Sequence, residues 1–213
     1  MAGFVGVSED FHRPRSPSGA GLVLTHGAGG SARAPLLVAL AEAFADRGVT
    51  VLRYDLPYRQ ASATAPPRPA GAATDREGLR SAVASMRAAV TGRVFLGGQS
   101  YGGRQASMLL AGAPGLADAL LLLSYPLHPP RRPVKLRTAH LPNLKTPTLF
   151  AHGSRDPFGT LEEMAAARSL IPARTTLVAV DGAAHDVFRA PKRAGSDIAA
   201  EIASAFLQFV GAA

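Results

Sequence analysis

The sequence predicts an α/β fold, with a mainly parallel, twisted sheet of about six to seven strands and helices on both faces. The first observation is that short apolar runs alternate with longer segments of helical periodicity from about residue 19 onward. The second is that parallel strands need crossover connections, which the intervening helices supply. The third is size, since 213 residues with 47% hydrophobic content suit one core. We therefore expect a single domain over residues 1–213.

The first elements follow one another closely. Residues 22–25 predict a strand that stops at the glycine-rich turn His26-Gly27-Ala28-Gly29-Gly30. A helix is predicted next, because apolar side chains recur at helical spacing at Leu37, Leu40, Ala41 and Phe44. Gly48 suits the C-terminal cap of this helix, and residues 49–54 predict the second strand.

The remaining elements repeat this alternation. Apolar runs predict strands at residues 94–96, 119–124, 148–151 and 176–180. Helical spacing predicts helices at residues 76–89, 101–111 and 161–171, and a last helix that carries Ile198, Ile202, Phe206 and Phe209. Two long connections, residues 56–75 and 126–147, each follow a predicted strand and leave the C-terminal edge of the sheet, where ligands bind in open α/β sheets. Both are too short to form a large cap over that edge.

Composition excludes several classes of protein. The chain has no cysteine, which excludes disulfides, thiolate zinc sites, cysteine nucleophiles and iron–sulfur clusters. No apolar run approaches the ~18 residues of a membrane span, and residues 1–10 lack the basic and apolar regions of a signal peptide. We expect a soluble, cytoplasmic protein that contacts no membrane and needs no metal or organic cofactor.

The net charge of +8 raises the question of a nucleic-acid partner. Of the 23 basic residues, only Lys135, Lys145 and Lys192 are lysines, so arginine dominates, as in chains from GC-rich genomes. The sequence contains no basic helix, no zinc-finger motif and no ribonucleoprotein motif. Nucleic acid is therefore not predicted as the main partner.

Residues 126–147 carry five basic side chains and no acidic one. This connection predicts an anionic group on a substrate, with Arg131 and Arg132 as the candidate binding residues. The alternative is a solvated loop in an arginine-rich chain.

The motif Gly98-Gln99-Ser100-Tyr101-Gly102 lies between the strand at 94–96 and the helix at 101–111. A Gly-x-Ser-x-Gly motif alone is weak evidence, but this strand-to-helix context suits a nucleophilic serine on a sharp turn. The small residues two before and two after Ser100 let the chain bend and the helix pack. Ser100 is therefore the candidate nucleophile, and a solvated serine in a glycine-rich turn is the alternative.

A nucleophilic serine needs a base, and His185 is the candidate among six histidines. It lies just beyond the predicted strand at 176–180, and therefore at the same edge of the sheet as Ser100. His26 and His152 also follow strands, but each precedes a glycine in a tight turn, where we expect the ring to brace the loop.

Asp156 is the candidate carboxylate that orients His185, because it follows the strand at 148–151. The competing carboxylates are Asp55, Asp118, Asp181 and Asp186. Asp118 precedes its strand and lies at the wrong edge, Asp186 adjoins the histidine, and Asp55 suits a loop anchor. For the oxyanion we expect the backbone N–H of Tyr101 and that of Ala28 or Gly29 in the first glycine-rich turn.

The chain order Ser100, Asp156, His185 resembles that of the α/β-hydrolase superfamily, over about residue 19 to the C-terminus. Within it, the chain resembles the small, cap-less branch grouped with dienelactone-hydrolase-like proteins. Dienelactone hydrolase itself uses a cysteine nucleophile, which this chain lacks. The motifs that begin at His26, Ser124 (Ser-Tyr-Pro-Leu-His-Pro) and Gly153 (Gly-Ser-Arg-Asp-Pro-Phe-Gly) are similar to those of bacterial relatives of a chromatin-acetyltransferase-complex subunit and its testis-expressed homologue.

The predicted function is therefore that of a serine hydrolase that cleaves an ester-type acyl bond of a small substrate. The alternative is a non-catalytic protein-interaction module on the same scaffold, because the eukaryotic relatives belong to a large complex and fold alone does not fix function.

Overall fold

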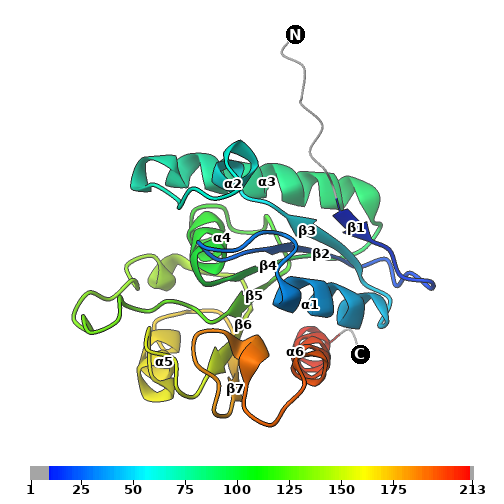
Figure 1. Ribbon diagram of the computed structural model, residues 1–213. Coiled ribbons are helices and arrows are strands. Elements are labelled where there is room, and N and C mark those ends of the chain that lie inside the picture. The colour runs from blue at the N-terminus through cyan, green and yellow to red at the C-terminus, as the bar shows by residue number, and fades with distance from the viewer. Residues whose placement is uncertain (1–9, 212–213) are drawn as a thin grey trace.

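The computed structural model describes residues 10–211 of the chain (Figure 1). Within this range the strands form a seven-stranded sheet in the order β1-β3-β2-β4-β5-β6-β7. All neighbours pair in parallel except β1, which is antiparallel to β3. The strands are β1 (Asp10–His12), β2 (Gly21–Thr25), β3 (Thr50–Tyr54), β4 (Val94–Gln99), β5 (Ala119–Leu123), β6 (Thr148–Gly153) and β7 (Thr175–Val180).

Helices cover both faces of this sheet, as Figure 1 shows. The α-helices are α1 (Pro35–Ala45), α2 (Pro57–Ala61), α3 (Ala72–Ala89), α4 (Ser100–Gly112), α5 (Leu161–Arg168) and α6 (Gly195–Val210). Helices α1 and α6 pack on one face, and α3, α4 and α5 pack on the other. The predicted α/β fold class is confirmed.

Burial on both faces explains why the strands are continuous apolar runs. In β2, the side chains of Leu22 and Leu24 join the core under α1 and α6, while Val23 joins the core on the opposite face. The first core also holds Phe206 of α6, whose ring lies 5.3 Å from that of Phe95 in an edge-to-face contact. The sheet is thus fixed in position from both sides.

The strand order places the functional edge of the molecule. Strand β2 lies between β3 and β4, so the chain leaves β2 toward one side and later returns on the other. In this register Thr25, the last residue of β2, pairs with Gly98 of β4. The loop after β2 and the turn after β4 therefore face each other at the topological switch point, where open α/β sheets bind ligands.

The structure differs from the predicted elements in several places, and helix α5, predicted to reach residue 171, ends at Arg168. Strand β4 continues through two glycines to Gln99, which carried no apolar signal. Helix α3 begins at Ala72, because alanines propagate a helix without forming an apolar stripe. Strand β1 was not predicted, since three residues paired at an edge are too few for a periodic pattern. Residues 56–75 hold α2 and the 3₁₀ turn η1 (Pro69–Gly71).

The connection at residues 126–147 is irregular apart from the 3₁₀ turn η2 (Leu141–Asn143), but hydrogen bonds fix it. The hydroxyl of Tyr125 donates to the carbonyl of Arg137 at 2.7 Å, and the amide of Arg137 donates to the carbonyl of Leu127 at 2.8 Å. Further along, Nε2 of His140 lies 2.8 Å from Oγ of Ser107 on α4. The segment is therefore attached to the sheet edge and to α4.

Among the described residues, no helix has the length and apolar character needed to cross a membrane. The prediction that there is no signal peptide concerns mainly residues 1–9, which lie outside the described residues. The division of the chain into one domain stays a prediction.

We predict that Gly102→Ala lowers the free energy of unfolding by about 1–3 kcal/mol, the usual range for overpacking. An added Cβ at this position of α4 would collide with the carbonyl oxygen of His26. The matched control is Gly112→Ala in the last turn of the same helix, where no atom lies within 4 Å of the added Cβ. This control should gain up to about 1 kcal/mol from helix propensity. Urea denaturation measures both, and equal stability of the two variants would contradict the packing argument.

We also predict that His140 makes the protein less stable in mild acid. Burial, and then the positive charge of Arg104, lower the pKa of His140 to about 4, whereas an unfolded histidine titrates near ~6.5. Between these pH values His140 is protonated in the unfolded chain but not in the folded one. The free energy of unfolding therefore falls as the pH drops from about 6.5 to about 4. Urea denaturation across this range should show a shallower pH slope in His140→Gln, and an unchanged slope would refute the prediction.

Candidate active site

Ser100 lies at the junction where β4 passes directly into α4. Its backbone has a φ of 49°, a left-handed conformation that costs energy in a residue with a Cβ. The turn is tight enough that a Cβ on Gly98 would lie 2.6 Å from the amide nitrogen of Gly103. A Cβ on Gly102 would strike the loop after β2. Glycines at these positions therefore let the turn close, and the turn presents the Ser100 side chain at the sheet edge.

The structure brings the predicted nucleophile, base and acid together. Nε2 of His185 lies 2.8 Å from Oγ of Ser100. On the other side of the ring, Nδ1 lies 2.8 Å from Oδ2 and 3.0 Å from Oδ1 of Asp156. Because an ionised carboxylate only accepts hydrogen bonds, Nδ1 carries the proton and Nε2 is left to accept the Ser100 hydroxyl proton. In this arrangement Nε2 of His185 can accept the hydroxyl proton of Ser100.

Asp156 is held by its own loop. Its side chain is fully buried, and Oδ1 also accepts the amide of Phe158 at 2.9 Å. The ring of Phe158 lies over the imidazole of His185, with 4.1 Å between the centroids. His152, in strand β6, donates from Nε2 to the carbonyl of Gly159 at 2.8 Å and so ties the end of this loop to the strand. The side chain of His185 is 26% exposed, which leaves the base accessible to a substrate or water.

Backbone contacts join the loop after β6, which carries Asp156, to the loop after β7, which carries His185. The amide of Ser154 donates to the carbonyl of Val180 at 3.1 Å, and that of Arg155 donates to the carbonyl of Ala183 at 2.9 Å. Gly153 lies so close to this second loop that an added Cβ would overlap the carbonyl oxygens of Ala183 and Ala184. The distance between Asp156 and His185 is therefore set by the main chain.

The turn after β2 has its carbonyl groups held by α2. The hydroxyl of Tyr58 lies 3.1 and 3.0 Å from the carbonyl oxygens of Gly27 and Ala28. Arg59 donates from Nε to the carbonyl of Gly30 at 2.8 Å and from Nη2 to that of Ala28 at 3.1 Å. The carbonyl of Gly27 and the N–H of Ala28 belong to one peptide group and point in opposite directions. Because the carbonyl points toward α2, the N–H of Ala28 points away from α2. Tyr58 and Arg59 belong to no motif, so their role was not predicted from the sequence.

His26 braces the same turn, as predicted. Its Nε2 accepts the amide of Leu56 at 3.1 Å, so the proton resides on Nδ1 and is donated to the carbonyl of Gly27 at 2.8 Å. Burial is the main cause that lowers the pKa of His26, and burial likewise lowers the pKa of His152. Both rings are thus neutral structural groups.

The amides of Tyr101 and Ala28 are the two candidate oxyanion donors beside Ser100. Within residues 10–211 neither N–H has a hydrogen-bond acceptor, and both residues line the cavity at Ser100. Gly29, the alternative donor, is not among the lining residues. The hydroxyl of Tyr101 turns away and donates to the buried Asp75 at 2.7 Å; burial first, and then this bond, raise the pKa of Tyr101.

The competing carboxylates occupy other places. Asp55 accepts the amide of Ala32 at 2.6 Å and so anchors a loop. Asp118 accepts the amide of Val94 at 2.8 Å, at the beginning of β4 and thus at the opposite edge of the sheet. Asp186 caps the 3₁₀ turn η3 (Val187–Arg189) through the amide of Phe188.

A cavity of about 380 Å³ opens beside the nucleophile. It is lined by Ala28, Pro67, Arg68, Pro69, Ala72, Ser100, Tyr101, Arg104, Gln105, Pro126, Arg137 and Phe158. Arg131 and Arg132 are exposed and are not among these residues, so their predicted part in substrate binding stays a prediction without a contact to support it. The structure places Arg68, Arg104 and Arg137 at the cavity instead.

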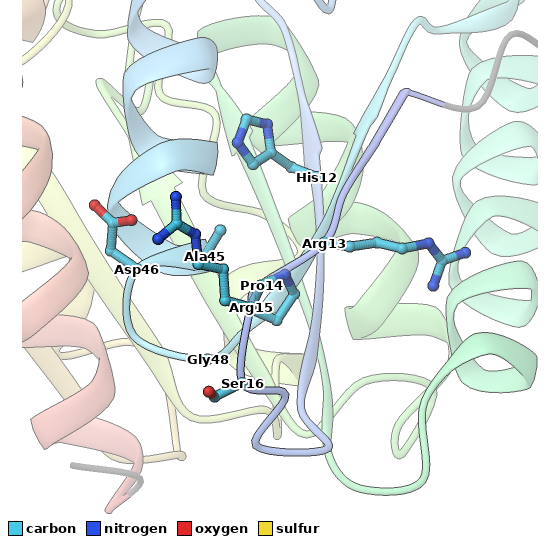
Figure 2. Close-up of a pocket in the computed structure, with 8 residues that line it drawn as sticks. All are labelled: His12, Arg13, Pro14, Arg15, Ser16, Ala45, Asp46 and Gly48. Atoms are coloured by element: carbon cyan, nitrogen blue, oxygen red, sulfur yellow. The ribbon is translucent and has the colours of Figure 1, made fainter.

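A second hollow of about 490 Å³ lies away from this site, near β1 and the end of α1 (Figure 2). Figure 2 shows the side chains of Arg15 and Asp46 on one side of it and that of Arg13 extending the other way. None of the residues that line it is Ser100, Asp156 or His185. The smaller cavity is therefore the one that reaches the candidate nucleophile.

In the part of the chain that the structure describes, no three histidine or carboxylate side chains gather closely enough to hold a metal ion.

Solved structures share this architecture. A monoacylglycerol lipase from Paleococcus ferrophilus is 15% identical, with a TM-score of 0.75 over 98% of this chain and 100% of that one. XC6422 from Xanthomonas campestris, described as a serine hydrolase without lid, is 17% identical, with a TM-score of 0.69 over 94% and 86%. A dienelactone hydrolase from Anabaena variabilis is 23% identical, with a TM-score of 0.67 over 91% and 88%. At these identities the likeness shows the fold alone.

The sequence itself matches a family model described as an alpha/beta hydrolase domain over residues 18–212. This match takes in every helix and every strand except β1, and it includes the turn at Ser100 and the loops of Asp156 and His185. The chain therefore belongs to the alpha/beta hydrolase domain family.

Proposed function

We propose that the protein is a serine hydrolase that cleaves an ester-type acyl bond of a small substrate. The observation that carries the proposal is the continuous line of hydrogen bonds from Asp156 through His185 to Ser100, beside a cavity lined by Ser100. At about 380 Å³, the cavity falls within the range of small-molecule sites. The absence of a cap in a structural relative described as a serine hydrolase without lid agrees with an open site.

In the first half of the reaction, Oγ of Ser100 attacks the ester carbonyl while Nε2 of His185 takes the hydroxyl proton. The carbonyl oxygen becomes an oxyanion, which the amides of Tyr101 and Ala28 stabilise. Asp156 keeps the His185 proton on Nδ1 and stabilises the imidazolium. The tetrahedral intermediate then breaks the ester bond, and the alcohol leaves with the proton from His185.

In the second half, a water molecule attacks the acyl group on Ser100 while His185 takes one of its protons. The new tetrahedral intermediate expels Oγ of Ser100, which recovers the proton from His185, and the acid leaves. The partial exposure of His185 suits this step, because the water must reach Nε2.

The closer resemblance to bacterial relatives of the chromatin-complex subunit stays a prediction, and so does the alternative of a non-catalytic interaction module. A module that only binds partners does not need an activated serine. Labelling of Ser100 therefore separates the two functions.

We predict that a fluorophosphonate probe labels the wild-type protein and that Ser100→Ala and His185→Ala each abolish the labelling. Hydrolysis of 4-nitrophenyl butyrate should fall in both variants by at least about a thousandfold, as expected when a member of a triad is removed. Gel fluorescence measures the first effect and release of nitrophenolate the second.

The matched controls are Ser81→Ala on the exposed side of α3 and His12→Ala on β1, neither of which is near the site. Both should label and hydrolyse as the wild type does. A folded wild-type protein that neither labels nor hydrolyses would overturn the proposal in favour of the interaction module.

We also predict that Tyr58→Phe lowers kcat for the same ester by about tenfold with little change in KM. The hydroxyl of Tyr58 contacts the carbonyls of Gly27 and Ala28, so its loss loosens the amide that stabilises the oxyanion. Tyr54→Phe removes the hydroxyl of a neighbouring buried tyrosine whose side-chain partner is Gln60 and should retain kcat. A fall in kcat of equal size in both variants would argue against a positioning role for Tyr58.

A further inference from the structure

The cavity beside Ser100 is strongly positive. Arg68, Arg104 and Arg137 line it, and no aspartate or glutamate is among its lining residues. Within residues 10–211, none of these three arginines forms an ion pair. Three arginines thus line one cavity, and none of its lining residues carries a negative charge.

Arg104 and Arg137 form the inner part of this cluster. Both are partly buried, whereas Arg68 is exposed. Nε of Arg104 is buried and, among the described residues, donates to no acceptor. Burial first, and then the positive charge of Arg104, lower the pKa of Arg137, as expected for two cations whose residues line one cavity. A buried donor without an acceptor and two repelling cations are both costly in a folded protein.

The position of each arginine is fixed by the fold. Arg104 follows Ser100 by four residues on α4, and residues four apart lie on the same face of a helix. Arg137 is held by its main chain, which is bonded to Tyr125 and Leu127, and Nη1 donates to the carbonyl of Pro126 at 3.2 Å. The two cations are therefore preorganised next to the nucleophile.

An amide donor adds to the cluster. Gln105 lines the same cavity and its Oε1 accepts a hydrogen bond from Arg76 at 2.9 Å, while its buried Nε2 has no acceptor among the described residues. Two unused buried donors, Nε of Arg104 and Nε2 of Gln105, thus belong to residues that line one cavity.

We propose that Arg104 and Arg137 bind a carboxylate of the substrate, so that the preferred substrates are small anionic esters such as monoesters of short dicarboxylic acids. A carboxylate supplies two acceptor oxygens that match the planar guanidinium group, and its charge relieves the repulsion between the two arginines. The inference rests on the proposed serine hydrolase function, and it moves the anionic recognition from Arg131 and Arg132 to the cavity.

The first test compares esters matched in size but not in charge. The pairs are 4-nitrophenyl hemiglutarate against 4-nitrophenyl valerate, with the charge on the acyl side, and 4-acetoxybenzoate against 4-acetylphenyl acetate, with the charge on the alcohol side. In at least one pair, kcat/KM for the anionic ester should be higher by about tenfold or more, and the preference should shrink as salt screens it. No preference in either pair would overturn the proposal.

The second test assigns the preference to residues. The double variant Arg104→Gln and Arg137→Gln should lose about tenfold or more of the ratio between the anionic and the neutral ester. The matched control, Lys135→Gln with Lys145→Gln, makes the same change in net charge at two exposed lysines of the 126–147 connection and should keep the ratio. A third pair, Arg131→Gln with Arg132→Gln, should also keep it, and loss of the ratio in this pair instead would overturn the assignment.

The third test does not depend on hydrolysis. Calorimetry should detect glutarate binding to the Ser100→Ala variant, while glutaramide, its neutral analogue, should not bind. Adding Arg104→Gln and Arg137→Gln to that variant should abolish the binding, with urea denaturation as the check on folding. Glutarate binding by a protein that fails the labelling test would refute the hydrolase function alone. Labelling without glutarate binding would refute the anionic substrate alone.

Discussion

The left-handed backbone at Ser100 is the constraint on which the rest of the site depends. Strand β4 ends at Gln99 and helix α4 begins at the next residue, so no connecting loop absorbs the change of direction. The turn is possible because Gly98 and Gly102 have no side chains where the main chain of α4 and of the neighbouring turn approach. The strain is small beside the packing of α4 on the sheet. In return, the Ser100 hydroxyl occupies a fixed point at the edge of the sheet, and the other segments can be arranged around it.

Three histidines lie at this edge of the sheet, His26 and His185 after strands β2 and β7 and His152 in the last two residues of β6, and burial separates their roles. His26 and His152 are fully buried, and desolvation keeps their rings neutral, so each acts as a rigid link that ties a tight turn to a backbone carbonyl. His185 is partly exposed and bonded on both sides, to Asp156 and to Ser100. A group that must exchange protons with substrate and water cannot be sealed in the core. The same residue type, placed at the ends of three parallel strands, thus supplies two braces and one candidate base.

The sequence predicts the fold and the grouping of Ser100, His185 and Asp156 because both depend on one simple rule: parallel strands end at the same edge. The rule does not reach residues whose position depends on packing between segments. Tyr58 and Arg59 lie in a short helix that has no apolar pattern, yet they hold the carbonyls of the turn after β2. For the basic connection at 126–147, the charge count indicates where cations gather along the chain but not which of them faces the cavity. Only Arg137 does, since the hydroxyl of Tyr125 anchors it.

The arrangement of Arg104 and Arg137 has a cost that the fold alone does not explain. Repulsion between two partly buried guanidinium groups destabilises the folded chain, and an unpartnered Nε adds the desolvation of a donor. A substitution that removed either charge would relieve this repulsion, so stability gives no reason to hold both arginines in place. Binding of an anion gives such a reason, because its negative charge offsets the repulsion between the two arginines when the ester reaches Ser100. The fold holds the main chain of both arginines in place, which keeps the entropic cost of that binding low.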